Sequence, residues 1–139
     1  MNNKNIIGMI FGAAAFLIVY LAVQQVFFKP ISFENQIREM ANDLNKSCPI
    51  MVDSETQLNN AMVLNDNTFE YNYTLVNMGR AELDIEALES YLQPIILNNI
   101  KTSPDLKIFR DNEITMVYNY KDKNGEQLFR IVFEAENYK

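Results

Sequence analysis

The feature that most constrains this chain is an apolar run at residues 6–28, IIGMIFGAAAFLIVYLAVQQVFF, which contains no charged residue and no proline. As an α-helix with a rise of about 1.5 Å per residue, it would extend roughly 34 Å, which is enough to cross the roughly 30 Å hydrocarbon core of a bilayer. A helix satisfies its own backbone hydrogen bonds and is therefore stable in lipid. The sequence thus predicts a single-pass transmembrane anchor over residues 1–29 and a soluble domain over residues 30–139.

A cleaved signal peptide is the competing interpretation of the same segment. Such a peptide has an apolar stretch of about 7–15 residues and a small-x-small cleavage site. Here the unbroken apolar part extends over residues 6–23, and the following Gln24-Gln25-Val26 contains no Ala-x-Ala pattern. An uncleaved signal anchor is favoured. We expect the amino terminus to stay inside and the domain to be translocated, although positive residues after the run outnumber Lys4 and so oppose this orientation.

The apolar run also contains a small-residue face, formed by Gly8-x-x-x-Gly12 and the three alanines that follow. Such a face allows two membrane helices to approach closely. Gly and Ala are equally common in membrane helices that make no such contact. Gly8 and Gly12 are therefore candidates for helix packing, with ordinary membrane-helix composition as the alternative.

The remainder of the chain is acidic and poor in residues that carry chemistry. All 18 Asp and Glu follow the apolar run, which leaves residues 30–139 with a formal charge of −8 and disfavours nucleic acid as a partner. There is no histidine to activate a nucleophile or bind a metal, and four glycines leave no phosphate-binding loop. The sequence predicts no enzyme activity, no cofactor and no metal. The one cysteine, Cys48, is interpreted as a buried filler or, if exposed in an oxidising compartment, a link between two copies.

Residues 30–139 alternate helical and strand patterns. A helix is expected at 33–46, where Ile37, Ala41 and Leu44 recur at helical spacing. A second helix begins near Asp84 and meets Pro94 inside its apolar pattern, which predicts a kink or two pieces. A short helix is expected at 103–111. Strands are expected at 57–64, 68–77, 113–121 and 126–134.

Turn residues join these strands in pairs. Asn65-Asp66-Asn67 separates the first two strands, and Asp122-Lys123-Asn124-Gly125 separates the last two. Hairpin-linked strands with helices between them are typical of an α+β fold. We therefore expect a four-stranded antiparallel sheet made of two hairpins that pair with each other, with helices on one face, preceded by the transmembrane helix.

Two groups of residues are candidates for a ligand or partner contact. Asp53 and Thr56 lie where an extended segment turns into the first strand, although an Asp there also fixes a turn by accepting backbone N–H bonds. The second group alternates on two strands and would line one sheet face if the hairpins pair. Its members are Tyr71, Tyr73, Tyr118 and Tyr120. Aromatic sheet faces bind ligands, but they more often pack against helices.

Three ordered motifs resemble a family of small exported or membrane-anchored bacterial proteins of unknown function. They are Pro49-Ile50-Met51-Val52-Asp53-Ser54-Glu55-Thr56-Gln57-Leu58, Tyr71-Asn72-Tyr73-Thr74-Leu75-Val76-Asn77, and Tyr118-Asn119-Tyr120-Lys121-Asp122-Lys123-Asn124-Gly125. The resemblance covers about residues 36–138 and implies a bacterial envelope protein, without an activity or catalytic residues. Family members carry cysteines at the positions of Lys101 and Tyr138, so here packing must hold the C-terminal end.

Two functional hypotheses follow. The first is a non-enzymatic domain, anchored in a bacterial inner membrane through residues 6–28 and facing the periplasm, that contacts another envelope protein or a second copy of itself. The alternative is a small-ligand binding or sensor module that uses the tyrosine-rich face and Asp53. A carboxylate-based hydrolase ranks below both, because no second titratable group is specified by spacing.

Overall fold

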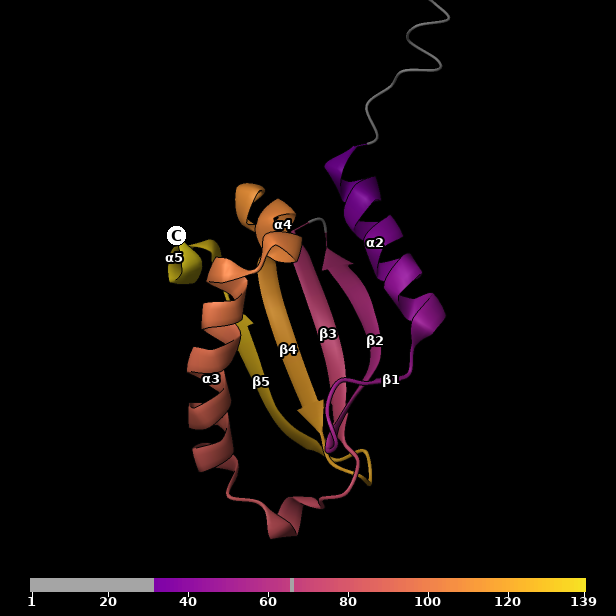
Figure 1. Ribbon diagram of the computed structural model, residues 1–139, viewed down its shortest axis with the longest axis vertical. Coiled ribbons are helices and arrows are strands. Elements are labelled where there is room, and N and C mark those ends of the chain that lie inside the picture. Colours follow the sequence, from indigo (N-terminus) through magenta and orange to yellow (C-terminus); the bar gives the residue numbers. More distant parts are fainter. Residues whose placement is uncertain (1–31, 66) are drawn as a thin grey trace, which may run out of the picture. The chain divides into compact units, whose positions relative to one another are not determined.

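A computed structural model describes residues 32–65 and 67–139 of the chain. The elements within these residues are helical and extended segments that alternate along the chain (Figure 1). In chain order they are α2 (Phe33–Ser47), β1 (Ile50–Met51), β2 (Thr56–Asn65), β3 (Thr68–Leu75), η1 (Arg80–Glu82), α3 (Ile85–Thr102), η2 (Pro104–Leu106), α4 (Lys107–Asp111), β4 (Thr115–Lys121), β5 (Gln127–Phe133) and α5 (Ala135–Tyr138).

Among the described helices, none is both long enough and apolar enough to cross a bilayer. The helix α3 has 18 residues, but it carries Glu86 in its first turn, Lys101 in its last turn and Pro94 inside. The single-pass, signal-anchor topology predicted from the sequence is therefore unsupported by the structure. The stretch at 6–28, with Gly8 and Gly12, lies outside the described residues.

The sheet corrects the predicted topology. The α+β class is confirmed, but the sheet is mixed, with five strands in the order β1-β2-β3-β4-β5. The pairs β1/β2, β2/β3 and β4/β5 are antiparallel, whereas β3 and β4 are parallel. The prediction of four antiparallel strands was wrong on both the number of strands and the direction of this central pair. The extra strand, β1, has only two residues and pairs Ile50 with Leu58.

The length of α3 explains the parallel pair. Its 18 residues extend about 27 Å at 1.5 Å each, and the eight residues of β3 extend about 26 Å at 3.3 Å each. The helix therefore returns the chain to the end of the sheet where β3 began, and the next strand must run in the same direction as β3. The helix is also continuous through Pro94, so the alternative of two separate helical pieces is not observed.

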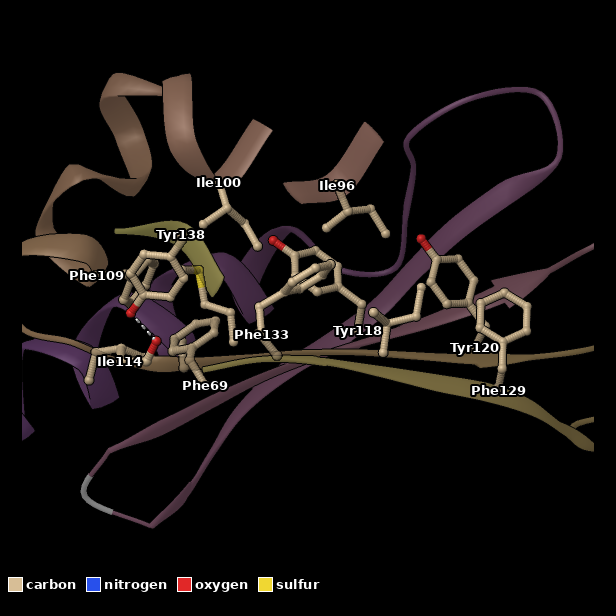
Figure 2. Close-up of a cluster of buried hydrophobic side chains, with 14 of the residues drawn as sticks. Phe69, Ile96, Ile100, Phe109, Ile114, Tyr118, Tyr120, Phe129, Phe133 and Tyr138 are labelled. Atoms are coloured by element: carbon tan, nitrogen blue, oxygen red, sulfur yellow. Dashed lines mark hydrogen bonds between the residues drawn. The ribbon is translucent and has the colours of Figure 1, made fainter. Parts of the chain in front are cut away.

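The core lies between one face of the sheet and the helices. Alternate side chains of β3, β4 and β5 point toward α3, as Figure 2 shows for Tyr118 and Phe133 beneath Ile96 and Ile100. From α2, Ile37 and Ala41 are buried, in agreement with the predicted helical stripe. The C-terminal end is held without a crosslink, because the Tyr138 hydroxyl donates to the carbonyl oxygen of Ile114 at 2.6 Å.

The outer edge of β2 is covered by α2. The side-chain amide of Asn45 donates to the carbonyl oxygen of Ala61 and accepts from its backbone N–H, both at 2.7 Å. β1 pairs with β2 only at Gln57 and Leu58, so beyond that point this side chain replaces a neighbouring strand. A sheet edge that is satisfied in this way is less open to pairing with another chain.

Candidate functional site

A groove of about 760 Å³ lies on the helix-covered face of the sheet, between α3 and the turn that links β1 to β2. We call it the tyrosine groove, after the three tyrosines that form its floor, Tyr73, Tyr118 and Tyr120. One wall is the apolar side of α3, with Leu88, Leu92, Ile95 and Ile96. The other wall is the turn at residues 52–56. The site is thus assembled from segments that are far apart in the sequence.

The parallel pair β3/β4 aligns the tyrosines. Tyr71 lies opposite Tyr118 and Tyr73 lies opposite Tyr120 in the register of the two strands. The ring centroids are 5.2 Å apart in the first pair and 5.0 Å in the second, and the planes are 28° and 17° from parallel. Offset stacked rings at this spacing attract one another. The structure therefore brings together all four tyrosines that the sequence analysis singled out.

The hydroxyl groups of the four tyrosines have no hydrogen-bond partner within the described residues. In the same residues, no buried side-chain oxygen or nitrogen lacks a partner. Burial of the rings raises the pKa of Tyr120 to about 12 and raises the pKa values of Tyr71, Tyr73 and Tyr118 as well. The groove thus presents neutral hydroxyls that can donate or accept a hydrogen bond.

A second hollow of about 310 Å³ continues the floor toward the other end of α3. It shares Tyr73, Tyr118 and Asn99 with the tyrosine groove and adds Tyr71 and the segment at 103–106. The two hollows are therefore neighbours on the same face of the sheet.

Asp53 and Thr56 lie in the turn that forms the second wall. The Asp53 carboxylate accepts the backbone N–H groups of Glu55 at 2.8 Å and Thr56 at 2.7 Å. The bond from Glu55 is the main cause that holds the pKa of Asp53 below its ordinary value. This is the turn-fixing role considered from the sequence, and Asp53 performs it while lining the groove. Its role in binding stays a prediction.

The wall formed by α3 is apolar, and the turn contributes one exposed apolar side chain, Val52, to the other wall. Val52 is 53% exposed and Ile95 is 49% exposed, on opposite sides of the groove. Asp53 and Glu55 are the ionisable carboxylates among the described lining residues, and no Lys or Arg is found there. Exposed apolar side chains beside unpartnered hydroxyls are suited to an apolar or amphipathic ligand, with room for a positive charge near the turn.

The described residues contain no group of side chains arranged as a metal site. Among residues 32–65 and 67–139, no three His, Cys, Asp or Glu side chains are grouped so as to hold a metal ion. Cys48 is half-buried and free, and burial raises the pKa of its thiol.

Sequence analysis missed the walls of the groove. The apolar pattern of the helix predicted from Asp84 includes Ile95, but in the structure Ile96 and Ile100 face the core and Ile95 does not. The sequence did contain a signal, because Ile95 and Ile96 are adjacent and two neighbouring residues of a helix cannot both point at the same sheet. The apolar Met51-Val52 pair directly before the turn residues Asp53 and Ser54 was a second signal, and both side chains are exposed in the structure.

The mixed sheet with helices on one face defines this part of the chain as an α+β domain with a tyrosine-floored groove. The chain belongs to the family described as a domain of unknown function, DUF8479, whose model matches residues 32–129. This agrees with the resemblance to an uncharacterised family, while the three motifs themselves stay a prediction. No curated protein matches the sequence.

Solved structures with a similar fold come from bacterial export proteins. A Pseudomonas aeruginosa protein thought to be secreted is 9% identical, with a TM-score of 0.62 over 78% of this chain and 95% of its own. The pilotin EpsS of the Vibrio vulnificus type 2 secretion system is 10% identical, with a TM-score of 0.60 over 77% and 92%. The type II secretion system pilotin AspS of Vibrio cholerae is 13% identical, with a TM-score of 0.56 over 81% and 98%. At these identities the similarity shows the fold alone.

Proposed function

We propose that this domain is a non-enzymatic protein-binding module of the bacterial cell envelope, and that the tyrosine groove holds an apolar segment of its protein partner. The observation that carries the proposal is the pair of exposed apolar side chains on opposite walls of the groove, Val52 and Ile95. Neither side chain packs into the core, so both remain available for a ligand. An apolar peptide segment would bury them together with the ring edges of the floor.

The chemistry of the groove supports a binding role. Its hydroxyls have raised pKa values, so they stay neutral at physiological pH and are poor bases or nucleophiles. Asp53 is engaged by two backbone N–H groups, and among the described residues its carboxylate makes no hydrogen bond or ion pair with a titratable side chain that could act as its acid or base partner. Hydrogen bonding and apolar contact are therefore what these residues can offer.

The structural neighbours support an envelope location and a protein partner. Two of them are named as pilotins of type II secretion systems, and a third is thought to be secreted. This is consistent with a protein partner for the present chain. We infer a position outside the cytoplasm, facing the periplasm. A phosphatase fusion after Lys139 tests it, because such a fusion is active only when exported.

The experiment that tests the groove is site-specific photocrosslinking in native cells. A photoreactive residue replaces Ile95 or Val52 in the full chain, and a matched control places it at Met62, which is 40% exposed on the opposite sheet face. We expect one discrete adduct with a different protein at both groove positions, and we expect it to be lost when Tyr73→Ala is combined with either. The same heterologous adduct should be absent at Met62, where only an adduct with a second copy of the chain could form. A heterologous adduct that forms equally at Met62, or that is unaffected by Tyr73→Ala, would refute the proposal.

A small-molecule ligand is the second candidate function. It is favoured by the volume of about 760 Å³, which lies within the usual range for ligand pockets, and by hydroxyls that lack partners. Thermal-shift screening of the full chain discriminates the two. A compound that stabilises the wild type by several degrees, but not Tyr73→Ala or Asp53→Ala, would replace the peptide as the occupant.

A further inference from the structure

The sheet face opposite the tyrosine groove carries a row of amides that bond to one another across four strands. Asn72 donates to Asn60 at 3.0 Å, Asn119 donates to Asn72 at 2.8 Å, and Gln127 donates to Asn119 at 2.6 Å. These residues belong to β2, β3, β4 and β5, and we call the row the amide ladder. Their neighbours in sequence, such as Tyr71 and Tyr118, point to the helices, so the ladder lies on the face that no described helix covers.

The ladder has a direction and two unused ends. Every bond runs from β5 toward β2, which leaves the side-chain N–H of Asn60 without an acceptor and the side-chain oxygen of Gln127 without a donor among the described residues. A donor at one margin and an acceptor at the other are complementary. They meet if a second, identical face is laid on the first with the strand order reversed.

The adjacent row shows the same complementarity in apolar form. Met62, Glu70, Val117 and Val132 follow one another across β2 to β5 in the register of the sheet. Its two ends, Met62 and Val132, are each 40% exposed. Glu70 in the middle is already paired with Arg130 at 3.1 Å, and Val117 beside it in the row is 1% exposed. Reversed strand order would set Met62 of one copy against Val132 of the other.

Charge permits this approach. Among the side chains that the described strands place on the open face, Glu70 is the acidic one and Lys121 and Arg130 are basic, while the domain as a whole is strongly acidic. This face is therefore less negative than the domain as a whole, which favours the approach of two acidic copies. The amides of the ladder and the Glu70–Arg130 pair already bond to one another, so covering them leaves few polar groups unpaired.

We propose that the open face is a two-fold interface with a second copy of this chain, in which β2 of each copy lies over β5 of the other. Four strands spaced by about 4.8 Å, each about seven residues long at 3.3 Å per residue, cover roughly 450 Å² per copy. The total of roughly 900 Å² lies at the small end of specific interfaces, so we expect a weak dimer with a dissociation constant in the micromolar range. The tyrosine groove lies on the other side of the sheet and stays accessible in the dimer.

Cysteine crosslinking of the full chain in mild detergent tests the geometry. In a Cys48→Ser background, Met62→Cys and Val132→Cys are made in separately tagged chains and mixed with a short bismaleimide. We expect a mixed dimer from Met62→Cys with Val132→Cys, and several-fold less from Val132→Cys alone, because its two copies would be three strands apart. Tyr91→Cys, on α3 and 66% exposed, is the control and should give no mixed product.

A second measurement does not depend on cysteine chemistry. Val132→Lys should raise the dissociation constant of the otherwise wild-type full chain at least tenfold in sedimentation velocity, while Tyr91→Lys should leave it unchanged. A chain that stays monomeric at 200 µM, or crosslinks equally well through Tyr91→Cys, would overturn the interface. Neither result would bear on the tyrosine groove.

Discussion

The carboxylate of Asp122 accepts a hydrogen bond from the backbone N–H of Arg80 at 2.9 Å, although the two residues lie 42 positions apart. The same carboxylate accepts the N–H groups of Asn124 and Glu126, both at 2.8 Å. Its side chain is fully buried. The Asp122 side chain thus links the segment that follows β3 to the turn between β4 and β5. In that turn, Gly125 adopts the positive φ of 81° expected of an Asn-Gly turn.

Asp122→Asn should destabilise the fold and flatten its acid dependence. Burial raises the pKa of Asp122, but the N–H bonds from Arg80, Glu126 and Asn124 outweigh it and hold the pKa below its ordinary value. The stabilisation is therefore present above the unfolded pKa of about 3.9 and is lost as pH falls through the folded pKa. Urea unfolding at pH 7, 5 and 3 measures this. If the unfolding free energy of the variant decreases with acid as steeply as that of the wild type, Asp122 is not the group responsible for the acid dependence.

The stacked tyrosines should make the domain sensitive to alkali. Burial raises the pKa of Tyr120 to about 12, above the unfolded value of about 10. The stabilisation is therefore full below pH 10 and lost as pH rises through 12. We expect phenolate absorbance at 295 nm to rise together with unfolding, and Tyr120→Phe to retain more folded protein at pH 11. Phenolate that forms fully while the circular dichroism stays native would contradict this.

Asn45→Ala should open the edge of β2. The change removes both 2.7 Å bonds to Ala61 and leaves its backbone N–H and carbonyl unpaired, at a cost of about 2 kcal/mol in unfolding free energy. It should also increase aggregation, because an unpaired strand edge recruits other chains. Asn42→Ala, exposed on the same helix, is the matched control. Urea unfolding and light scattering give the two readouts, and equal behaviour of the two variants would argue against edge capping.

Two isoleucines of α3 should separate stability from binding. Ile100 is fully buried, so Ile100→Ala should lower the unfolding free energy by about 3 kcal/mol. Ile95 is 49% exposed in the groove wall, so Ile95→Ala should cost less than about 1 kcal/mol and still weaken partner capture at least tenfold. Chemical unfolding and the photocrosslink at Val52 measure the two effects. A stable Ile95→Ala variant with undiminished capture would remove this wall from the site.

Local patterns in the sequence were enough to predict most of the elements. The alternation at Tyr71 and Tyr73 and the Asn-Gly turn after Asp122 placed both hairpins correctly. The way in which the hairpins join was not predictable from those patterns, because it depends on the reach of α3. Only the floor of the groove was predictable from local patterns. Its tyrosines follow from period-two alternation, whereas the exposure of Ile95 and Val52 depends on where the helix and the turn lie above the sheet.

The parallel pairing of β3 with β4 also determines when the domain can finish folding. Tyr71 pairs with Tyr118, so this junction joins segments that lie nearly fifty residues apart, whereas each hairpin closes locally. A chain that emerges from its amino terminus during synthesis therefore presents β3, with one unpaired side and an aromatic face, until β4 has followed it. Misassembly is most favoured during that interval, whose length depends on the rate of chain elongation.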